Sequence, residues 1–175
     1  MMLNQRKKLR LQLAPSDRQL WAIGVVAVQW SQFEMWVQII GQTLLEGRAG
    51  ELDKFNSNRS VKGRIEVCES EVAGQLSDGA RATLLGLFRR AKDLQDQRDK
   101  IVHNQWTGAP DEEAKAVFNW APPHPQFEWK LDFGRVMAVA SGIDGLNAGI
   151  AELVISASPD KTLGGLVRSM RRPAS

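Results

Sequence analysis

The segment that follows Ser16 carries one unbroken apolar stripe with the period of an α-helix. Its large apolar residues recur every three or four positions over six successive steps, which places them on one face of a helix. They are Ile23, Val26, Trp30, Phe33, Val37, Ile40 and Leu44. Ser16, with Gln19 three residues later, fits a capping box at the start of this helix, and Gly47 and Gly50 fit its end. The stripe predicts a long first helix in a mainly helical chain.

Further apolar residues widen this face beyond what one core contact requires. They are Trp21, Val25, Val28, Trp36 and Ile39. A helix that is apolar over so much of its surface is expected to meet neighbours on two sides. This width favours a second subunit as one of the two neighbours.

Three more helices are predicted from the same periodicity. The second follows a polar connection over residues 48–59, and the third begins after Ser77-Asp78-Gly79, which offers an N-cap. The second helix carries Val61, Ile65, Cys68, Val72 and Leu76 on one face, the third carries Leu84, Leu87, Ala91, Leu94 and Ile101, and the fourth carries Val136, Val139, Ile143, Leu146, Ile150 and Leu153.

The stretch between the third and fourth helices has a different pattern. Residues 126–133 alternate strictly between polar and apolar side chains, and residues 115–120 form a second candidate strand between turn-rich segments. We therefore predict a small two-stranded β-hairpin here. The predicted fold class is all-α in the main, a four-helix bundle with a β-hairpin inserted between helices three and four.

The basic residues gather at the two ends of the chain. There are 23 Lys and Arg against 20 Asp and Glu, a net charge of +3. Residues 1–15 carry +4 and residues 158–175 carry +3, so residues 16–157 carry −4. We predict a basic N-terminal arm over 1–15, a helical domain over 16–157 and a basic C-terminal tail over 158–175. Basic arms can hold phosphate, but charged ends of this length are more often solvated.

Several classes of protein are disfavoured by composition and motif. The longest uninterrupted apolar run, residues 20–28, is far shorter than the roughly 20 residues that cross a bilayer, and residues 1–15 lack the features of a signal peptide. One cysteine and two histidines cannot build a disulfide framework or a Cys/His zinc site. No Gly-rich phosphate loop precedes a helix. We expect a cytoplasmic protein with no cofactor, no metal and no membrane association.

Arg98 interrupts the apolar stripe of the third helix. Burying an unpaired guanidinium is costly, so this side chain must meet a carboxylate, an anionic ligand or a wet cleft. Glu34 interrupts the apolar face of the first helix in the same way, and a Glu34–Arg98 pair would satisfy both charges. From the residues alone, a structural and a functional role for Arg98 both stay open.

His103 is one of only two histidines, and Asp99 precedes it by one helical turn, within hydrogen-bonding reach of the imidazole. Arg98 and His103 lie five positions apart, about 140° around an ideal helix. They are expected to share a cleft only if the helix ends or loosens near Val102, or if two subunits contribute one residue each. A structural and a catalytic His103 both stay open.

The run Arg98-Asp99-Lys100-Ile101-Val102-His103 resembles the R-x4-6-H motif of HEPN domains, including the polar residue directly after the arginine. The resemblance extends from the Phe33-Glu34 element of the first helix to the fourth helix. It implies a HEPN-like bundle and a metal-independent endoribonuclease whose cleft forms where two subunits pair. The resemblance also implies that the protein acts in a toxin–antitoxin or phage-defence system.

The resemblance also implies a role for each site residue. His103 would act as general base or acid on the RNA 2′-hydroxyl or the leaving 5′-oxygen, and Arg98 would bind the scissile phosphate. Asp99 would orient one of them, with Glu34 and Asn104 in support. The implied partners are a second copy of the chain, RNA, and an antitoxin or regulatory protein. The alternative is a non-catalytic HEPN-like dimerisation or interaction module, which the −4 charge of residues 16–157 favours.

Overall fold

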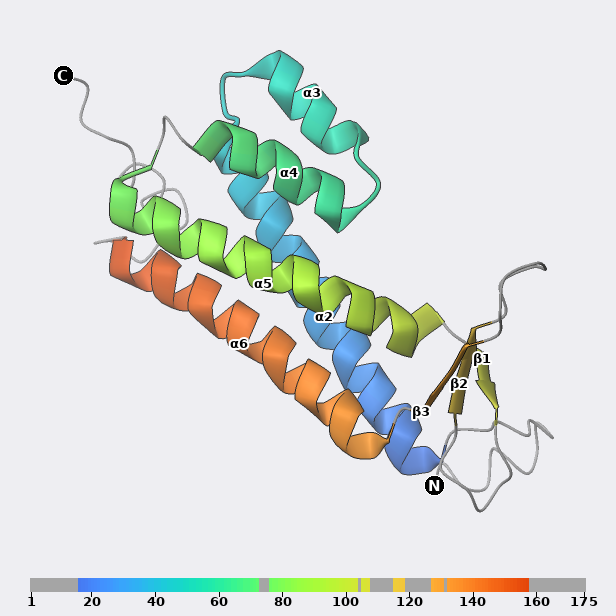
Figure 1. The fold of residues 1–175 in the computed structure, drawn as a ribbon. Helices are drawn as coiled ribbons and strands as arrows, with labels where there is room; N and C mark the ends of the chain where they lie inside the picture. The colour runs from blue at the N-terminus through green and yellow to red at the C-terminus, as the bar shows by residue number, and fades with distance from the viewer. Residues whose placement is uncertain are drawn as a thin grey trace, which may run out of the picture. The chain divides into compact units, whose positions relative to one another are not determined.

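The described part of the protein is mainly helical (Figure 1). The computed structural model describes residues 16–72, 76–103, 105–107, 115–118, 127–130 and 132–157, so the predicted arm and tail lie outside it. The helices are α2 (Asp17–Leu44), α3 (Ala49–Ser57), α4 (Val61–Val72), α5 (Asp78–His103) and α6 (Phe133–Ala157). The strands are β1 (Gln105–Thr107), β2 (Lys115–Phe118) and β3 (Phe127–Lys130).

The chain divides into two compact units, each built from separate parts of the sequence. The first unit comprises Met1–Ala27 and Gln97–Ala140, and the second comprises Val28–Asp96 and Ser141–Ser175. The strands and the end of α5 fall in the first unit, and α3 and α4 fall in the second. The prediction of one helical domain over residues 16–157 stays a prediction.

The predicted stripe of the first helix is the buried face of α2. From Val26 onward every predicted position is buried, and at the start Ala22 is buried in place of Ile23. The capping box is also confirmed, because the Ser16 N–H donates to Gln19 Oε1 at 2.9 Å and the Gln19 N–H donates to Ser16 Oγ at 3.2 Å. Gly47 follows the helix with a positive φ of 81°, the conformation that glycine adopts readily after a helix.

The prediction of a polar connection over residues 48–59 is wrong, because α3 occupies most of this segment (Figure 1). Phe55 holds this short helix in place, and its side chain is fully buried. The ring lies directly over Gly41 of α2, where a Cβ would overlap it. One aromatic residue therefore fixes a helix whose other residues are mostly polar.

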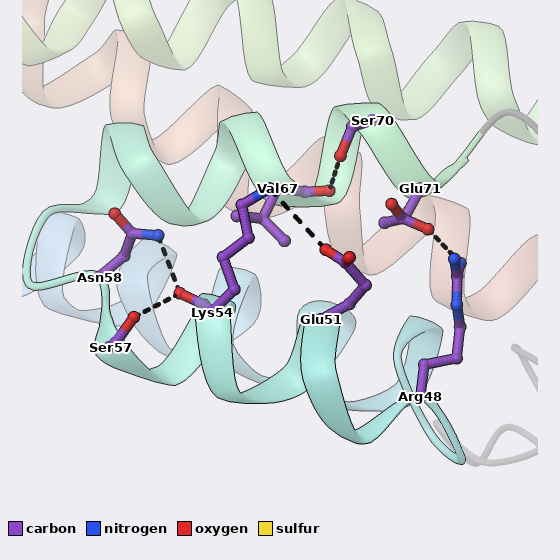
Figure 2. Close-up of polar contacts among 8 residues, drawn as sticks. All are labelled: Arg48, Glu51, Lys54, Ser57, Asn58, Val67, Ser70 and Glu71. Atoms are coloured by element: carbon purple, nitrogen blue, oxygen red, sulfur yellow. Dashed lines mark hydrogen bonds and ion pairs between the residues drawn. The ribbon is translucent and has the colours of Figure 1, made fainter.

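One ion pair joins the start of α3 to α4, which lies beside it, and further polar contacts hold the other end of α3 (Figure 2). Arg48, just before α3, forms an ion pair with Glu71 of α4. At the other end of α3, the Lys54 carbonyl accepts hydrogen bonds from Ser57 Oγ at 2.9 Å and Asn58 Nδ2 at 3.0 Å. Both ends of α3 are thus held by side chains, which compensates for its weak apolar face.

Substitution of Gly41 tests the contact between α2 and α3. We expect Gly41→Ala to lower the free energy of unfolding by roughly 1–3 kcal/mol, because the new methyl group would force the Phe55 ring to move. Gly86→Ala in α5 is the matched control, since a Cβ there meets nothing within 4 Å. It should raise stability by up to about 1 kcal/mol through helix propensity. Urea unfolding measures both, and equal effects would contradict the packing of Phe55 on α2.

In the second unit α6 packs closely against α5 and is tied to α2. Gly142 and Gly149 leave space that Leu94 and Leu87 of α5 occupy. The buried Asn147 donates from Nδ2 to the Gln29 carbonyl at 3.1 Å. Small residues on α6 thus permit a close approach of α5, and one buried amide fixes its register on α2.

The first unit contains a three-stranded antiparallel sheet in the order β1-β2-β3 (Figure 1). β2 and β3 lie within the two segments predicted as strands, and Phe118 pairs with Phe127. The third strand, β1, follows α5 and was not predicted. Phe133 does not end a strand as predicted. It begins α6, because Asp132 Oδ1 caps that helix by accepting from the Arg135 N–H at 2.7 Å.

Among the described helices, α6 alone has a stretch, Phe133–Leu153, that is long and apolar enough to cross a membrane by length and composition. The sequence-based argument against a membrane span considered only the apolar run of residues 20–28, and it therefore missed this stretch of α6. The core helix of a soluble protein passes the same test, and 44 % of this stretch is buried within the protein.

Cys68 is fully buried in α4, and burial raises the pKa of its thiol from 9.0 to about 12. We expect no reaction with a thiol reagent at pH 8 in the folded protein and full reaction after denaturation. Because the folded pKa is raised, the stability that this thiol contributes is complete below pH 9 and is lost as pH rises towards 12. Rapid labelling of the native protein would contradict this burial.

Candidate functional site

Three of the predicted site residues meet at the C-terminal end of α5. Arg98 Nη1 donates to Asp99 Oδ1 at 2.8 Å and lies 2.8 Å from His103 Nε2. His103 is the last residue of the helix. One nitrogen of the guanidinium thus contacts both the carboxylate and the imidazole.

The contact between Arg98 and His103 is a hydrogen bond only when the ring nitrogen accepts. A guanidinium has donors only, so in such a bond Nε2 of His103 would be the acceptor and the ring proton would lie on Nδ1. Nε2 also lies 3.9 Å from Asp99 Oδ1, a separation at which a protonated ring could form an ion pair. Asp99 is therefore placed to stabilise the ring once it has gained a proton.

The three side chains differ in their exposure to solvent. The Arg98 side chain is 17 % exposed, that of Asp99 43 % and that of His103 64 %. The fixed positive charge is thus mostly enclosed, whereas the ring that can exchange a proton faces solvent.

The structure meets one of the two conditions under which Arg98 and His103 were expected to converge, because α5 ends at His103, one residue after Val102. α5 is helical through His103, and the two side chains meet within one chain. Five residues advance a helix by about 7.5 Å, a length that an extended arginine side chain can cover. The angular argument followed the directions of the Cα–Cβ bonds and did not include this reach.

The two remaining supporting residues are placed less directly. Glu34 Oε1 accepts from the indole Nε1 of Trp30 at 2.8 Å, one turn away on α2. Glu34 belongs to the second unit and Arg98 to the first, so their pairing stays a prediction. Asn104 lies outside the described residues.

One contact in the first unit had no signal in the sequence. The Arg18 guanidinium carbon lies 3.7 Å from the centroid of the Phe133 ring, which joins the start of α2 to the start of α6. Because 115 positions separate the two residues, no local pattern could have paired them. Within the described residues, no group of three His, Cys, Asp or Glu side chains could hold a metal ion.

Comparisons with family models, with curated proteins and with solved structures give no match for this chain. A functional interpretation therefore rests on the motif and on the geometry of Arg98, Asp99 and His103.

Proposed function

We propose that the protein is a metal-independent endoribonuclease of the HEPN type that acts as a homodimer in the cytoplasm. One observation carries the proposal, the 2.8 Å contact between Arg98 Nη1 and His103 Nε2. It pairs a fixed positive charge with an imidazole nitrogen that can accept a proton when the ring is neutral. Cleavage of RNA by its own 2′-hydroxyl requires such a pair.

The proposal includes the fold, which would be a HEPN-like four-helix bundle. Its four helices would be α2, α4, α5 and α6, and α3 would be an additional helix. The sheet between α5 and α6 in the sequence supports this arrangement, because it follows the motif directly. A toxin–antitoxin or phage-defence setting, with an antitoxin or regulatory partner, belongs to the same proposal.

Each site residue has a defined step in the proposed reaction. An RNA phosphate replaces His103 as a hydrogen-bond acceptor for Arg98, which frees Nε2 for the 2′-hydroxyl. Nε2 takes the proton as the 2′-oxygen bonds to phosphorus, and the bond from phosphorus to the 5′-oxygen breaks. The leaving oxygen gains a proton from solvent or from a second histidine. Arg98 stabilises the charge that develops on the phosphate, and Asp99 stabilises the protonated ring.

A cleavage assay in excess EDTA tests the proposal. We expect the wild-type protein to cut a single-stranded RNA panel, and we expect His103→Ala to lose at least about 10²-fold in rate, the usual contribution of general acid–base catalysis. Lys100→Ala, at another position in the motif, is the control and should stay active. Intact RNA with the wild-type protein, or full activity in His103→Ala, would reject the ribonuclease.

One observation favours a non-catalytic interaction module as the second candidate. Arg98 already has two partners on its own helix, Asp99 and His103, and such a cluster stabilises a helix end without any substrate. In that case the His103→Ala variant would show a lower melting temperature, and the wild-type protein would cleave no RNA.

A further inference from the structure

The start of α2 carries a basic and a large aromatic side chain that both face solvent. Arg18 is exposed, and Trp21, three residues further along the helix, is 58 % exposed. Residues three apart are neighbours on the surface of a helix, so the two side chains share one face. Among the described helical residues of the first unit, Trp21 is the one large hydrophobic residue with such exposure.

Phe133, at the start of α6, completes this surface from a distant part of the sequence. The starts of α2 and α6 lie side by side (Figure 1), and the Arg18 guanidinium carbon lies over the Phe133 ring, 3.7 Å from its centroid. All three residues belong to the first unit. We call Arg18, Trp21 and Phe133 the aromatic–arginine surface.

The Arg18 guanidinium keeps its hydrogen-bond donors available. Within the described part of the chain its side chain forms no hydrogen bond or ion pair, and its contact is the one with the Phe133 ring. Arg64 differs, because its Nε donates to the Asn58 carbonyl at 3.0 Å. A guanidinium that lies over a ring keeps its N–H groups for a phosphate, while the ring holds it in place. Arg18 is therefore a positioned cation that can bind an anion.

The charge of the adjoining sequence also favours an anionic ligand. Residues 1–15, which lead directly into α2, carry +4 and contain no acidic residue. The charge of Asp17 offsets that of Arg18, and the charge of Asp132 offsets that of Arg135, so these four residues together add nothing. The ligand that fits this surface thus combines negative charge, for Arg18 and the basic residues, with a flat ring for Trp21.

We propose that the aromatic–arginine surface binds a single-stranded nucleic acid, with one base stacked on Trp21 and a neighbouring phosphate on Arg18. Stacking on exposed aromatic side chains and a basic path for the backbone are the two features by which proteins hold single strands. An acidic peptide would supply the charge but not a flat ring at every position. The inference goes beyond the proposed function, because strand binding requires no 2′-hydroxyl and neither Arg98 nor His103.

Binding of a fluorescein-labelled single-stranded deoxyoligonucleotide to the full chain, measured by anisotropy, tests the stacking. We expect Trp21→Leu to raise Kd about tenfold, within the usual contribution of base–aromatic stacking, and Trp21→Phe to keep most of the affinity. Met35→Leu is the matched control, since Met35 is also exposed on α2 but belongs to the second unit. It should bind as the wild type does. Equal affinity of Trp21→Leu and the wild type would overturn the inference.

Salt dependence of the same binding tests the role of Arg18. We expect Arg18→Gln to raise Kd and to lower the slope of log Kd against log salt concentration by about 0.7, the value for one phosphate contact on a single strand. Arg90→Gln removes an exposed arginine of the second unit and should leave the slope unchanged. Equal effects of the two variants would contradict a positioned phosphate contact. Competition by duplex DNA or polyglutamate as strong as by the single strand would show that the surface recognises charge alone.

The deoxy strand separates this inference from the proposed function, because it lacks the 2′-hydroxyl that the proposed cleavage requires. If the wild-type protein cuts RNA but Trp21→Leu binds the deoxy strand as tightly as the wild type, the inference is wrong and the ribonuclease stands. If the strand binds through Trp21 and Arg18 but no RNA is cut, the inference stands and the ribonuclease is rejected.

Discussion

Replacing Arg98 with alanine is expected to lower the rate of RNA cleavage by about 10²- to 10³-fold, the usual cost of losing one donor to developing negative charge. Arg98 is the mostly enclosed member of the site and contacts both Asp99 and His103. Its removal therefore takes away the phosphate contact and also leaves the imidazole without its hydrogen bond. Single-turnover cleavage in EDTA measures the loss.

Two controls separate this loss from a general effect of charge. Arg90→Ala removes an exposed arginine from the same helix and should keep the wild-type rate. Arg98→Lys keeps the charge but not the planar fork of donors, so we expect an intermediate rate. The Arg98→Ala, His103→Ala double variant should lose much less than the product of the single losses, because the two residues act together. Independent, multiplicative losses would contradict the direct contact between them.

Replacing Trp30 with alanine is expected to lower the free energy of unfolding by about 3–5 kcal/mol. Trp30 is 2 % exposed, and its ring centroid lies 5.3 Å from that of Phe33. The substitution would leave a large cavity and would also remove the 2.8 Å hydrogen bond to Glu34 Oε1. Urea unfolding measures the loss.

Trp21→Ala is the matched control, since Trp21 belongs to the same helix but is 58 % exposed. Trp21→Ala should change stability by less than about 0.5 kcal/mol. Similar losses for the two tryptophans would contradict the orientation of α2.

The orientation of α2 could be predicted from sequence because its signal is local and repeated. Seven apolar positions at helical spacing, with Ser16 and Gln19 at the start, leave one rotation of the helix that buries the stripe. The structure buries Val26 and Trp30 as predicted, and it leaves Trp21 and Val28 exposed on the widened face. Local periodicity shows which side chains share a face of the helix. Only the structure shows which of the two apolar faces is buried by other parts of the same chain.

The short elements could not be predicted because a single residue or a distant partner fixes them. α3 depends on Phe55 packing over Gly41, and a lone aromatic residue among polar ones has no periodicity. β1 is three residues long and is a strand only through its pairing with β2, for example Trp106 with Ala116. Both are consequences of tertiary contact.

The candidate site was identified from the residues, but its geometry was not. An arginine in an apolar seam and a nearby histidine are visible in the sequence. Their 2.8 Å contact depends on the path of a long side chain along α5, which an argument from helical angles leaves out. The contact of Arg98 with Asp99, its neighbour in sequence, depends on side-chain conformation in the same way.

Cleavage of an RNA oligonucleotide and of the same sequence made entirely of 2′-deoxynucleotides, in excess EDTA, tests the proposed function most directly. The reaction assigned to His103 and Arg98 uses the 2′-oxygen as the nucleophile. The wild-type protein should therefore cut the RNA to products that end in a 2′,3′-cyclic phosphate and should leave the deoxy strand whole. Cleavage of both strands at similar rates, or of neither, would contradict that function.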